Sequence, residues 1–409
     1  MSSPSSLIPD AHFSTPHPPS FIPAQLAEWL PARTVLMCEP GVETLFSILH
    51  TDAANFLFPF SLAQGREEHR AYRRALEAHG VQVVDLRALL TQADRARLVQ
   101  WARQAVAFDF DAQLTDEERA SVVTQLDAAL NALDAGSLVD VLMLRPTLRV
   151  ARDDAALDAT TRFKAQFTLA PLSPYYTRDP LITTRAGVVI TRLKLAQRAA
   201  ENDLAAYALE VLGIRPIYRV QAPGTLEGGD FIPCGDFVLQ GQGLLTNEDG
   251  VQQCLAHRVY GYVEVAVVED PRMGMDEMHL DTYFAMLDRD LAICEDSRLN
   301  GDAEPAVKVY APQGTPTDFT YALTRTMLFS RYLTEKGIRV IPFSKAEQER
   351  FAANGLLVAP RRLIAVAGAG EACLQRLREA GVEVHLIAFD ALTGGYGGPH
   401  CSSQVLLRG

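Results

Sequence analysis

Apolar and polar positions follow one repeated design along the chain. In five segments a helical pattern leads to a glycine, and a short run of alternating apolar residues typical of a strand follows. Glycine often ends a helix because it tolerates a left-handed backbone. The glycines are Gly80 in RRALEAHGVQVVDL, Gly213 in AYALEVLGIRPIYR, Gly261 in CLAHRVYGYVEVAVV, Gly337 in SRYLTEKGIRVIPF and Gly381 in QRLREAGVEVHLIAF. Five copies of one helix–strand unit predict an α/β fold with a repeat architecture.

The spacing of these units predicts an insert. The gap between Gly80 and Gly213 is longer than any other gap in the series. TQADRARLVQWARQAVAFDF and TDEERASVVTQLDAALNALDAG lie within it, and both have helical patterns. Thr115 and Glu118 form the signature of a capping box before the second of them. We therefore expect a helical insert over about residues 91–148.

Composition restricts the kinds of partner. The chain has 409 residues, of which 48% are apolar and 22% charged, as in ordinary globular proteins. Its net charge of −12 argues against a nucleic-acid partner and is compatible with a cationic small molecule. We expect no membrane partner, because no stretch has the length and apolarity of a membrane span. Residues 1–30 are rich in proline and serine and are expected to form a tail before the folded domain of residues 31–409.

The cysteines bear on compartment and chemistry. Six are scattered along the chain, without a CxxC pair or the spacing of a zinc site. This pattern favours free thiols in a reducing cytoplasm, and it predicts no metal site. The last of them, Cys401, follows the glycine-rich stretch GGYGGPH. A structural cysteine has no need of such a loop, whereas a nucleophile that must approach a substrate closely does.

Residues with chemistry follow the predicted strands. EGGD (Glu227 to Asp230) follows Gly213, HLD (His279 to Asp281) follows Gly261, and Cys401 follows Gly381. If the units surround one axis, these positions converge at its centre. On a strand, His279 and Asp281 would face the same side. A further stretch, YYTRDP, offers Asp179. Each residue alone has an ordinary structural explanation, but together they favour a site.

A thiolate, an imidazole and several carboxylates suit the chemistry of a guanidinium group. Carboxylates match its planar fork of N–H donors, and they would hold its carbon in front of the Cys401 sulfur. Because that carbon is a poor electrophile, orientation must supply much of the rate. A nearby cationic histidine or the bound substrate would favour the thiolate. His279 would give a proton to departing ammonia and later take one from water.

The motifs TRDP, EGGD, MHLDT and GGPHC, in that order, resemble those of the arginine deiminases in the guanidino-group-modifying superfamily, also called the pentein or amidinotransferase superfamily. The resemblance runs from about Arg33 to the C-terminus and includes the helical insert. It implies a five-bladed α/β propeller of ββαβ-type units that forms the catalytic domain. It also implies hydrolysis of a guanidino compound to a ureido product and ammonia, without metal or organic cofactor. The default reaction is L-arginine to L-citrulline, and a homo-oligomer is possible.

The resemblance also implies roles for single residues. Cys401 would be the nucleophile and His279 the general acid and base. Asp179 and Asp281 would bind the guanidinium nitrogens, with Glu227 supporting the same site. Substrate-binding positions around them are Arg198, which would bind the substrate carboxylate, and Asp230, Tyr176 and Ser173. Of these, Asp230 is also suited to holding the EGGD turn.

The chain departs from the family pattern at the end of the site that would recognise the rest of the substrate. Ser173 stands where the family usually has asparagine, and Leu245 where it typically has a carboxylate-binding arginine. The acidic family stretch LFDD is LFPF here, Leu57 to Phe60. Loss of a buried arginine–carboxylate contact costs about 2–5 kcal/mol. A modified guanidine, or one that is not an α-amino acid, is therefore an alternative substrate.

Three other functions fit some of the same residues. An amidinotransferase would use an amine in place of water, although the helical insert favours the deiminase branch. A metal-dependent hydrolase would use His279, Asp281 and Glu227 as ligands. A non-catalytic binding protein would have no use for a nucleophile, and the complete set of cysteine, histidine and carboxylates argues against it.

Overall fold

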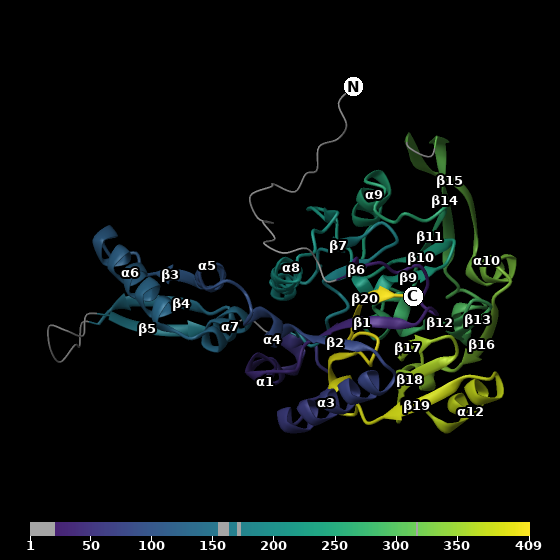
Figure 1. Ribbon diagram of the computed structural model, residues 1–409, viewed down its shortest axis with the longest axis horizontal. Coiled ribbons are helices and arrows are strands. Elements are labelled where there is room, and N and C mark those ends of the chain that lie inside the picture. The colour runs from purple at the N-terminus through teal and green to yellow at the C-terminus, as the bar shows by residue number, and fades with distance from the viewer. Residues whose placement is uncertain (1–20, 154–162, 170–172, 316–317) are drawn as a thin grey trace.

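The computed structural model describes residues 21–153, 163–169, 173–315 and 318–409 (Figure 1). Within these ranges the strands form six sheets, of which one has five strands and the others three. Helices lie between the strands in sequence and cover the sheets on the outside (Figure 1). The expected α/β class is therefore confirmed. No helix among the described residues has both the length and the apolar character of a membrane span.

Five of the sheets share one motif. In each, two strands pair antiparallel, and a helix that follows the second of them leads to a strand that pairs with it in parallel. In the order of their helices along the chain, the motifs are β20 (Gln404–Arg408), β1 (Ala32–Met37), α3 (Leu62–Ala78) and β2 (Gln82–Asp85); β6 (Leu181–Thr183), β7 (Val188–Ile190), α8 (Glu201–Val211) and β8 (Tyr218–Arg219); β9 (Phe231–Cys234), β10 (Phe237–Gln242), α9 (Glu248–Ala256) and β11 (Glu264–Glu269); β12 (Phe284–Asp288), β13 (Leu291–Glu295), α10 (Phe329–Glu335) and β16 (Arg339–Phe343); and β17 (Leu356–Ala359), β18 (Arg362–Val366), α12 (Glu371–Glu379) and β19 (Glu383–Ile387).

The five glycines identified in the sequence stand at the same place in each motif, between its helix and the parallel strand that follows. All five have a left-handed backbone, with φ between +70° and +80°. Such angles cost little for glycine and much more for a residue with a Cβ. The glycines therefore end the five helices and let the chain return along the sheet.

The two ends of the described chain meet in one sheet. β20, near the C-terminus, pairs antiparallel with β1, near the N-terminus, and so completes the first motif. The described strands form no closed sheet, however, and the five motifs remain separate sheets. The five-bladed propeller is therefore not confirmed and stays a prediction.

Two additions interrupt the series of motifs. The first follows β2, projects from the body of the molecule (Figure 1), and contains strands as well as the expected helices. Its helices α4, α5 and α7 share a hydrophobic core with α8. The second is a long hairpin that extends the sheet of β9–β11. The first addition comprises α4 (Leu86–Leu90), α5 (Arg95–Ala105), β3 (Ala107–Phe110), α6 (Asp116–Ala132), α7 (Ala135–Leu144), β4 (Thr147–Arg152) and β5 (Phe163–Thr168), and the second β14 (Ala306–Thr315) and β15 (Asp318–Leu328). The short helices α1 (Val42–Ile48), α2 (Thr51–Ala54) and α11 (Lys345–Gln348) complete the set.

The expected tail of residues 1–30 lies partly outside the described residues, which begin at residue 21. From there on the segment packs against the body. Ala24 pairs with Leu407 beside β20, and Ala27 bridges to Cys234 on β9. The Glu28 side chain is buried and pairs with Arg408. Residues 24–28 thus belong to the packed structure.

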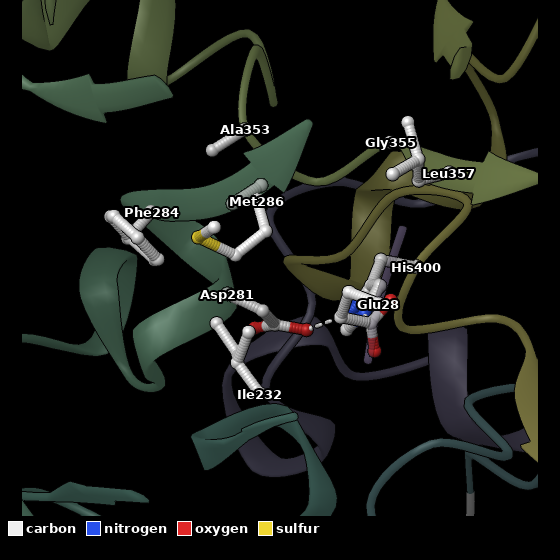
Figure 2. Close-up of a pocket in the computed structure, with 10 residues that line it drawn as sticks. Glu28, Ile232, Asp281, Phe284, Met286, Ala353, Gly355, Leu357 and His400 are labelled. Carbon is white, nitrogen blue, oxygen red and sulfur yellow. Dashed lines mark hydrogen bonds and ion pairs between the residues drawn. The ribbon is translucent and has the colours of Figure 1, made fainter. Parts of the chain in front are cut away.

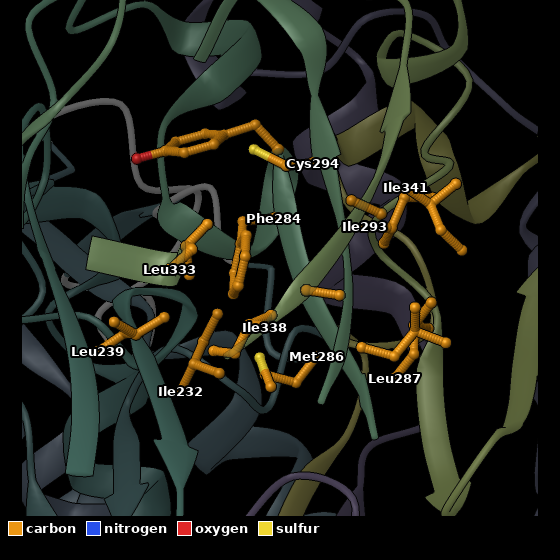
Figure 3. Packing of buried hydrophobic residues seen from close by; sticks show 14 of the residues in the cluster. Ile232, Leu239, Phe284, Met286, Leu287, Ile293, Cys294, Leu333, Ile338 and Ile341 are labelled. Atoms are coloured by element: carbon orange, nitrogen blue, oxygen red, sulfur yellow. The ribbon is translucent and has the colours of Figure 1, made fainter. Parts of the chain in front are cut away.

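The largest core cluster among the described residues contains side chains of the third, fourth and fifth motifs. Figure 3 shows part of it, from the third and fourth motifs. The cluster joins side chains of β9, β10, β12 and β13 to the helices α10 and α12, with Phe284 and Met286 of β12 among them. Close packing of this kind makes the strand ends rigid. Two of the loops that carry the candidate site enter strands of this core, EGGD before β9 and His279 to Asp281 before β12, so the packed core holds these two loops in place.

Candidate active site

The four motifs found in the sequence meet at one small cavity. Residues from the YYTRDP, MHLDT and GGYGGPHC stretches line it, although they are far apart in the chain. EGGD lies directly behind it, because Glu227 contacts the ring of His279. The lining consists of Tyr176, Asp179, Arg198, Met278, His279, Thr282, Gly395, Tyr396, Gly397 and Cys401.

Cys401 lies in a tight turn just before β20, and the residue is 5% exposed. The glycines before it allow this arrangement. A Cβ on Gly397 would stand 3.0 Å from the Cys401 sulfur and 2.8 Å from the ring of Tyr176. Backbone contacts fix the turn, because the amides of Gly398 and Cys401 both donate to the side-chain oxygen of Asn354, at 2.7 and 3.3 Å. The thiol therefore faces the cavity at close range.

The sequence analysis considered His279 and Asp281 as residues of a strand. In the structure they do not lie on one. Residues Leu280–Thr282 form a single 3₁₀ turn, with His279 in extended backbone just before it. The amide of Leu280 donates to Asp230 Oδ1 at 2.9 Å and anchors this turn. The turn still brings both side chains to the site, because Gly229 leaves room for them. A Cβ on Gly229 would lie 2.6 Å from His279 Nδ1 and 3.0 Å from Asp281 Oδ1.

Acidic neighbours surround the His279 ring. Its Nε2 lies 3.1 Å from Glu227 Oε2, and its Nδ1 lies 3.9 Å from Asp179 Oδ1. Burial alone would lower the pKa of His279, but the hydrogen bond with Glu227 and the negative charges of Asp179 and Asp230 raise this pKa to about 10. The same contact lowers the pKa of Glu227 despite its burial. The ring is therefore an imidazolium at neutral pH, able to donate a proton.

The same buried, acidic surroundings keep the thiol of Cys401 protonated. Burial raises its pKa well above the ordinary value, and the negative charges of Asp281 and Asp179 raise it further. The sulfur lies 3.6 Å from Asp281 Oδ2, to which the thiol donates. Cys401 is thus protonated while the cavity holds no cation, and a cation bound between the sulfur and the two carboxylates would favour the thiolate.

Three buried carboxylate oxygens of the expected site residues have no hydrogen-bond partner among the described residues. One is Asp230 Oδ2, on the residue that anchors the Leu280 turn. The other two are Asp179 Oδ1, on a residue that lines the cavity, and Asp281 Oδ1, on a residue that contacts the Cys401 sulfur without lining the cavity. Burial raises the pKa of Asp179, against the opposing charges of Arg198 and His279. Buried acceptors normally have donors, because each unsatisfied group costs about 1–3 kcal/mol. A planar cation with N–H donors on two edges would satisfy both oxygens.

Three of the expected substrate-binding residues have other contacts. Asp230 holds the Leu280 turn, and burial raises its pKa to about 6. Ser173 donates its amide to Glu201 Oε1 at 2.9 Å and does not line the cavity. Tyr176 does line it, and its hydroxyl donates to Leu392 O at 2.7 Å and accepts from the amide of Gly397. Its contacts thus hold the glycine-rich turn.

Arg198 lines the cavity but is committed to two acidic residues. Its Nη1 donates to Asp179 Oδ2 at 2.9 Å, while Nε and Nη2 donate to the two oxygens of Glu201 at 3.1 and 2.7 Å. Glu201 is at the start of α8 and is buried. The one arginine that lines this cavity therefore shares its charge with two carboxylates, and Asp179 keeps only Oδ1 for a ligand.

Sequence reasoning missed several residues that shape the site. Asn354 binds the turn of Cys401, and it also donates from Nδ2 to the backbone oxygen of Asp281 at 3.1 Å. His400 binds Asp281, with Nδ1 2.7 Å from Oδ2. His400 was visible as the neighbour of Cys401 in GGPHC, but nothing in the sequence connects Asn354 or Glu201 with the other motifs.

One group of described residues has the spacing of a metal site. Ligand atoms of Asp179, Glu227 and His279 lie within 4.8 Å of one another. The set overlaps only in part with the His279, Asp281 and Glu227 of the metal hypothesis. A protonated imidazole between two carboxylates accounts for the same spacing, because opposite charges draw these groups together.

The site combines a buried cysteine, an imidazolium and carboxylates with unpaired oxygens, and it lies between α/β motifs. Together the fold and the site define an enzyme that acts on guanidino groups. Comparison with known proteins gives the family. The family model for arginine deiminase matches residues 56–408, and the chain belongs to that family. The resemblance seen in the motifs is thus confirmed.

Relatives cover almost the whole chain. The arginine deiminase of Mycobacterium avium (strain 104) is 29% identical over 406 residues, which span 92% of this chain and 96% of the relative. The arginine deiminase of Oenococcus oeni (strain ATCC BAA-331 / PSU-1) is 24% identical over 412 residues, with 92% and 95% covered. Among solved structures, dimethylarginine dimethylaminohydrolase from Pseudomonas aeruginosa in complex with citrulline has a TM-score of 0.54 at 16% identity, with 91% and 98% covered. This last likeness shows the fold alone.

Proposed function

We propose that the protein is a deiminase that replaces one guanidino nitrogen of its substrate by oxygen, through a covalent intermediate on Cys401. The observation that carries the proposal is the pair of buried oxygens, Asp179 Oδ1 and Asp281 Oδ1, without hydrogen-bond partners among the described residues. Both carboxylates are close enough to Cys401 to raise the pKa of its thiol. A guanidinium bound to these oxygens would present its carbon to that sulfur.

The first half of the reaction forms the covalent intermediate. The bound cation lowers the pKa of Cys401, and the thiol proton passes to solvent. The thiolate attacks the guanidinium carbon, and a carbon–sulfur bond forms. His279 gives its proton to one terminal nitrogen, which leaves as ammonia with the electron pair of the carbon–nitrogen bond. An S-linked amidino cation and a neutral imidazole remain.

The second half releases the product. His279 takes a proton from water as the water oxygen bonds to the same carbon. The carbon–sulfur bond breaks and returns its electron pair to the sulfur. The product loses one proton to solvent and leaves as a neutral ureido compound. Glu227 stabilises the imidazolium at the start and end of the cycle, because its carboxylate contacts Nε2.

The architecture that fits this chemistry is the five-bladed propeller, with the five motifs around the cavity and residues 31–409 as one catalytic domain. The recurrence of one strand–helix motif supports it, as does the pairing of β20 with β1. A cytoplasmic location, a possible homo-oligomer and the absence of nucleic-acid or membrane partners complete the proposal.

L-arginine is the default substrate, because the relatives at 24–29% identity are named arginine deiminases. The contacts of Arg198 favour a second candidate, a guanidine without a free carboxylate. Arg198 is already bound by Asp179 and Glu201, and no other lining residue is an arginine or lysine. A substrate carboxylate would therefore meet a cation whose charge is already neutralised.

A screen of guanidino compounds tests the function and the substrate end together. L-arginine, agmatine, L-arginine amide and acylated or peptide-linked arginine are assayed for ammonia release without any added amine. We expect turnover, with kcat/KM for agmatine and arginine amide at least equal to that for L-arginine. Turnover only in the presence of an acceptor amine would indicate an amidinotransferase instead. An advantage of about 30-fold or more for L-arginine would show that its carboxylate is recognised.

Chelation distinguishes the thiol mechanism from the metal-dependent alternative. We expect dialysis against a chelator to leave ammonia release unchanged, because the positive charge of the His279 imidazolium lies between Glu227 and Asp179 and disfavours a metal cation there. Alkylation by iodoacetamide, mapped to Cys401 by mass spectrometry, is expected to abolish it. Loss of activity on chelation, with recovery on addition of a divalent metal, would support the metal site.

A further inference from the structure

A second layer of charged groups lies behind Asp281 (Figure 2). His400 Nδ1 is 2.7 Å from Asp281 Oδ2, and His400 Nε2 is 3.8 Å from Glu28 Oε1. Glu28 Oε2 in turn accepts from Arg408 Nη2 at 2.7 Å. All four side chains are buried. Asp281, His400 and Glu28 line a second cavity, whose other walls are apolar side chains and Gly355.

This layer decides which oxygen of Asp281 is available to a ligand. His400 binds Oδ2, whereas Oδ1 has no partner among the described residues and lies on the His279 side, beside Gly229. The thiol of Cys401 also donates to Oδ2, at 3.6 Å. Without His400, the thiol would be the remaining side-chain donor to this carboxylate among the described residues. It would then turn the carboxylate toward the sulfur and away from the ligand.

The backbone of His400 is fixed independently of its ring. Its amide donates to Asn354 O at 3.0 Å, and its oxygen accepts from Arg178 Nε at 3.2 Å. A change of side chain here should therefore leave the Cys401 turn in place. Glu28 belongs to the N-terminal segment, which precedes the 56–408 range of the family model. The layer thus couples that segment to the reacting end of the site.

We propose that His400, supported by Glu28, is a positioning residue. Its hydrogen bond to Oδ2 of Asp281 keeps Oδ1 directed at the guanidinium. This inference rests on the proposed function. The charge distribution agrees with it. Burial would raise the pKa of Asp281, but the hydrogen bond and charge of His400 lower it, with help from His279 and Arg178. Asp281 is thus held both in orientation and as an anion.

Two alkylating probes of the same shape test the inference without requiring turnover. Chloroacetamidine is a planar cation, and chloroacetamide is its neutral counterpart. Each reacts with Cys401 by forming a carbon–sulfur bond while chloride leaves with the carbon–chlorine electron pair and the thiol proton goes to solvent. The ratio of their rate constants, mapped to Cys401 by mass spectrometry, measures how well the site holds a cation. Changes in thiol reactivity affect both probes and cancel in the ratio.

A matched pair of variants separates positioning from simple volume. In His400→Asn a side-chain N–H remains near the place of Nδ1, whereas in His400→Gln it lies near the place of Nε2. We expect His400→Asn to keep the preference for the cation within about threefold of the unchanged protein, and His400→Gln to lose about 10- to 100-fold of it. Glu28→Gln leaves the ring in place and is expected to lower the ratio by about threefold.

The outcomes are distinct. Equal ratios in His400→Asn and His400→Gln would overturn the positioning role. If the unchanged protein showed no preference for the cation, the proposed guanidinium site itself would be refuted. Thermal unfolding checks that each variant is folded. Should either His400 variant fail to fold, Glu28→Gln decides, and an unchanged ratio in it overturns the proposal.

Discussion

Replacing Cys401 with alanine is expected to abolish ammonia release, by about ten-thousand-fold or more. The sulfur is the one nucleophile placed against the two carboxylates with free oxygens, and no other cysteine lines the cavity. Orientation by Asp179 and Asp281 cannot act without an atom to attack the carbon. The measurement is ammonia release with the best substrate from the screen, at saturating concentration.

Two further variants interpret that result. In Cys401→Ser a much less acidic hydroxyl replaces the thiol, so we expect turnover to be lost while calorimetry still detects substrate binding. Cys254 is also a buried free cysteine, on α9 and outside the lining of the cavity, and Cys254→Ala should retain full activity. Ammonia release by Cys401→Ala at more than about a hundredth of the normal rate would contradict the covalent mechanism.

The local signals in the sequence were sufficient for the framework of the fold. Helix, glycine and strand follow one another in all five motifs, because the left-handed backbone of Gly80 and its counterparts is a property of one residue. The strands of the insert and the β14–β15 hairpin were not predicted. A strand depends on its partners as much as on its own residues, and the partners are set by the tertiary fold.

The candidate site, too, was predictable only where a local pattern in the sequence indicated its residues. Residues within the four motifs could be named, since the chemistry of a guanidinium demands a thiolate, an acid and carboxylates. The turn that carries His279 and Asp281 was expected to be a strand, because spacing by two does not distinguish a strand from a 3₁₀ turn anchored by Asp230. The pairing of His400 with Glu28 joins residues at opposite ends of the chain, and no local pattern reveals it.

The charge state of the site explains why the substrate itself must complete it. In the ligand-free enzyme, burial and acidic neighbours keep the proton on Cys401, and acidic neighbours raise the pKa of His279 to about 10. A bound guanidinium adds a positive charge beside the same carboxylates. It therefore favours the thiolate and lowers the pKa of His279 toward the range in which an imidazolium can release its proton. In the proposed mechanism, both groups therefore become reactive only when a cation occupies the cavity.

Replacing His279 with alanine is expected to reduce kcat by about 10²- to 10⁴-fold, because both the departure of ammonia and the attack of water need its proton transfer. The pH profile of kcat/KM checks this role. In the unchanged enzyme it should rise with pH as the thiol of Cys401 ionises; loss of the imidazolium should stop this rise at about pH 10 and turn it into a fall once the thiol is fully ionised. The fall should be absent in His279→Ala. His69 is also buried, but its pKa is lowered to about 4 and it does not line the cavity, so His69→Ala should keep both limbs of the profile. An alkaline fall that persists in His279→Ala would assign the proton donor to another group.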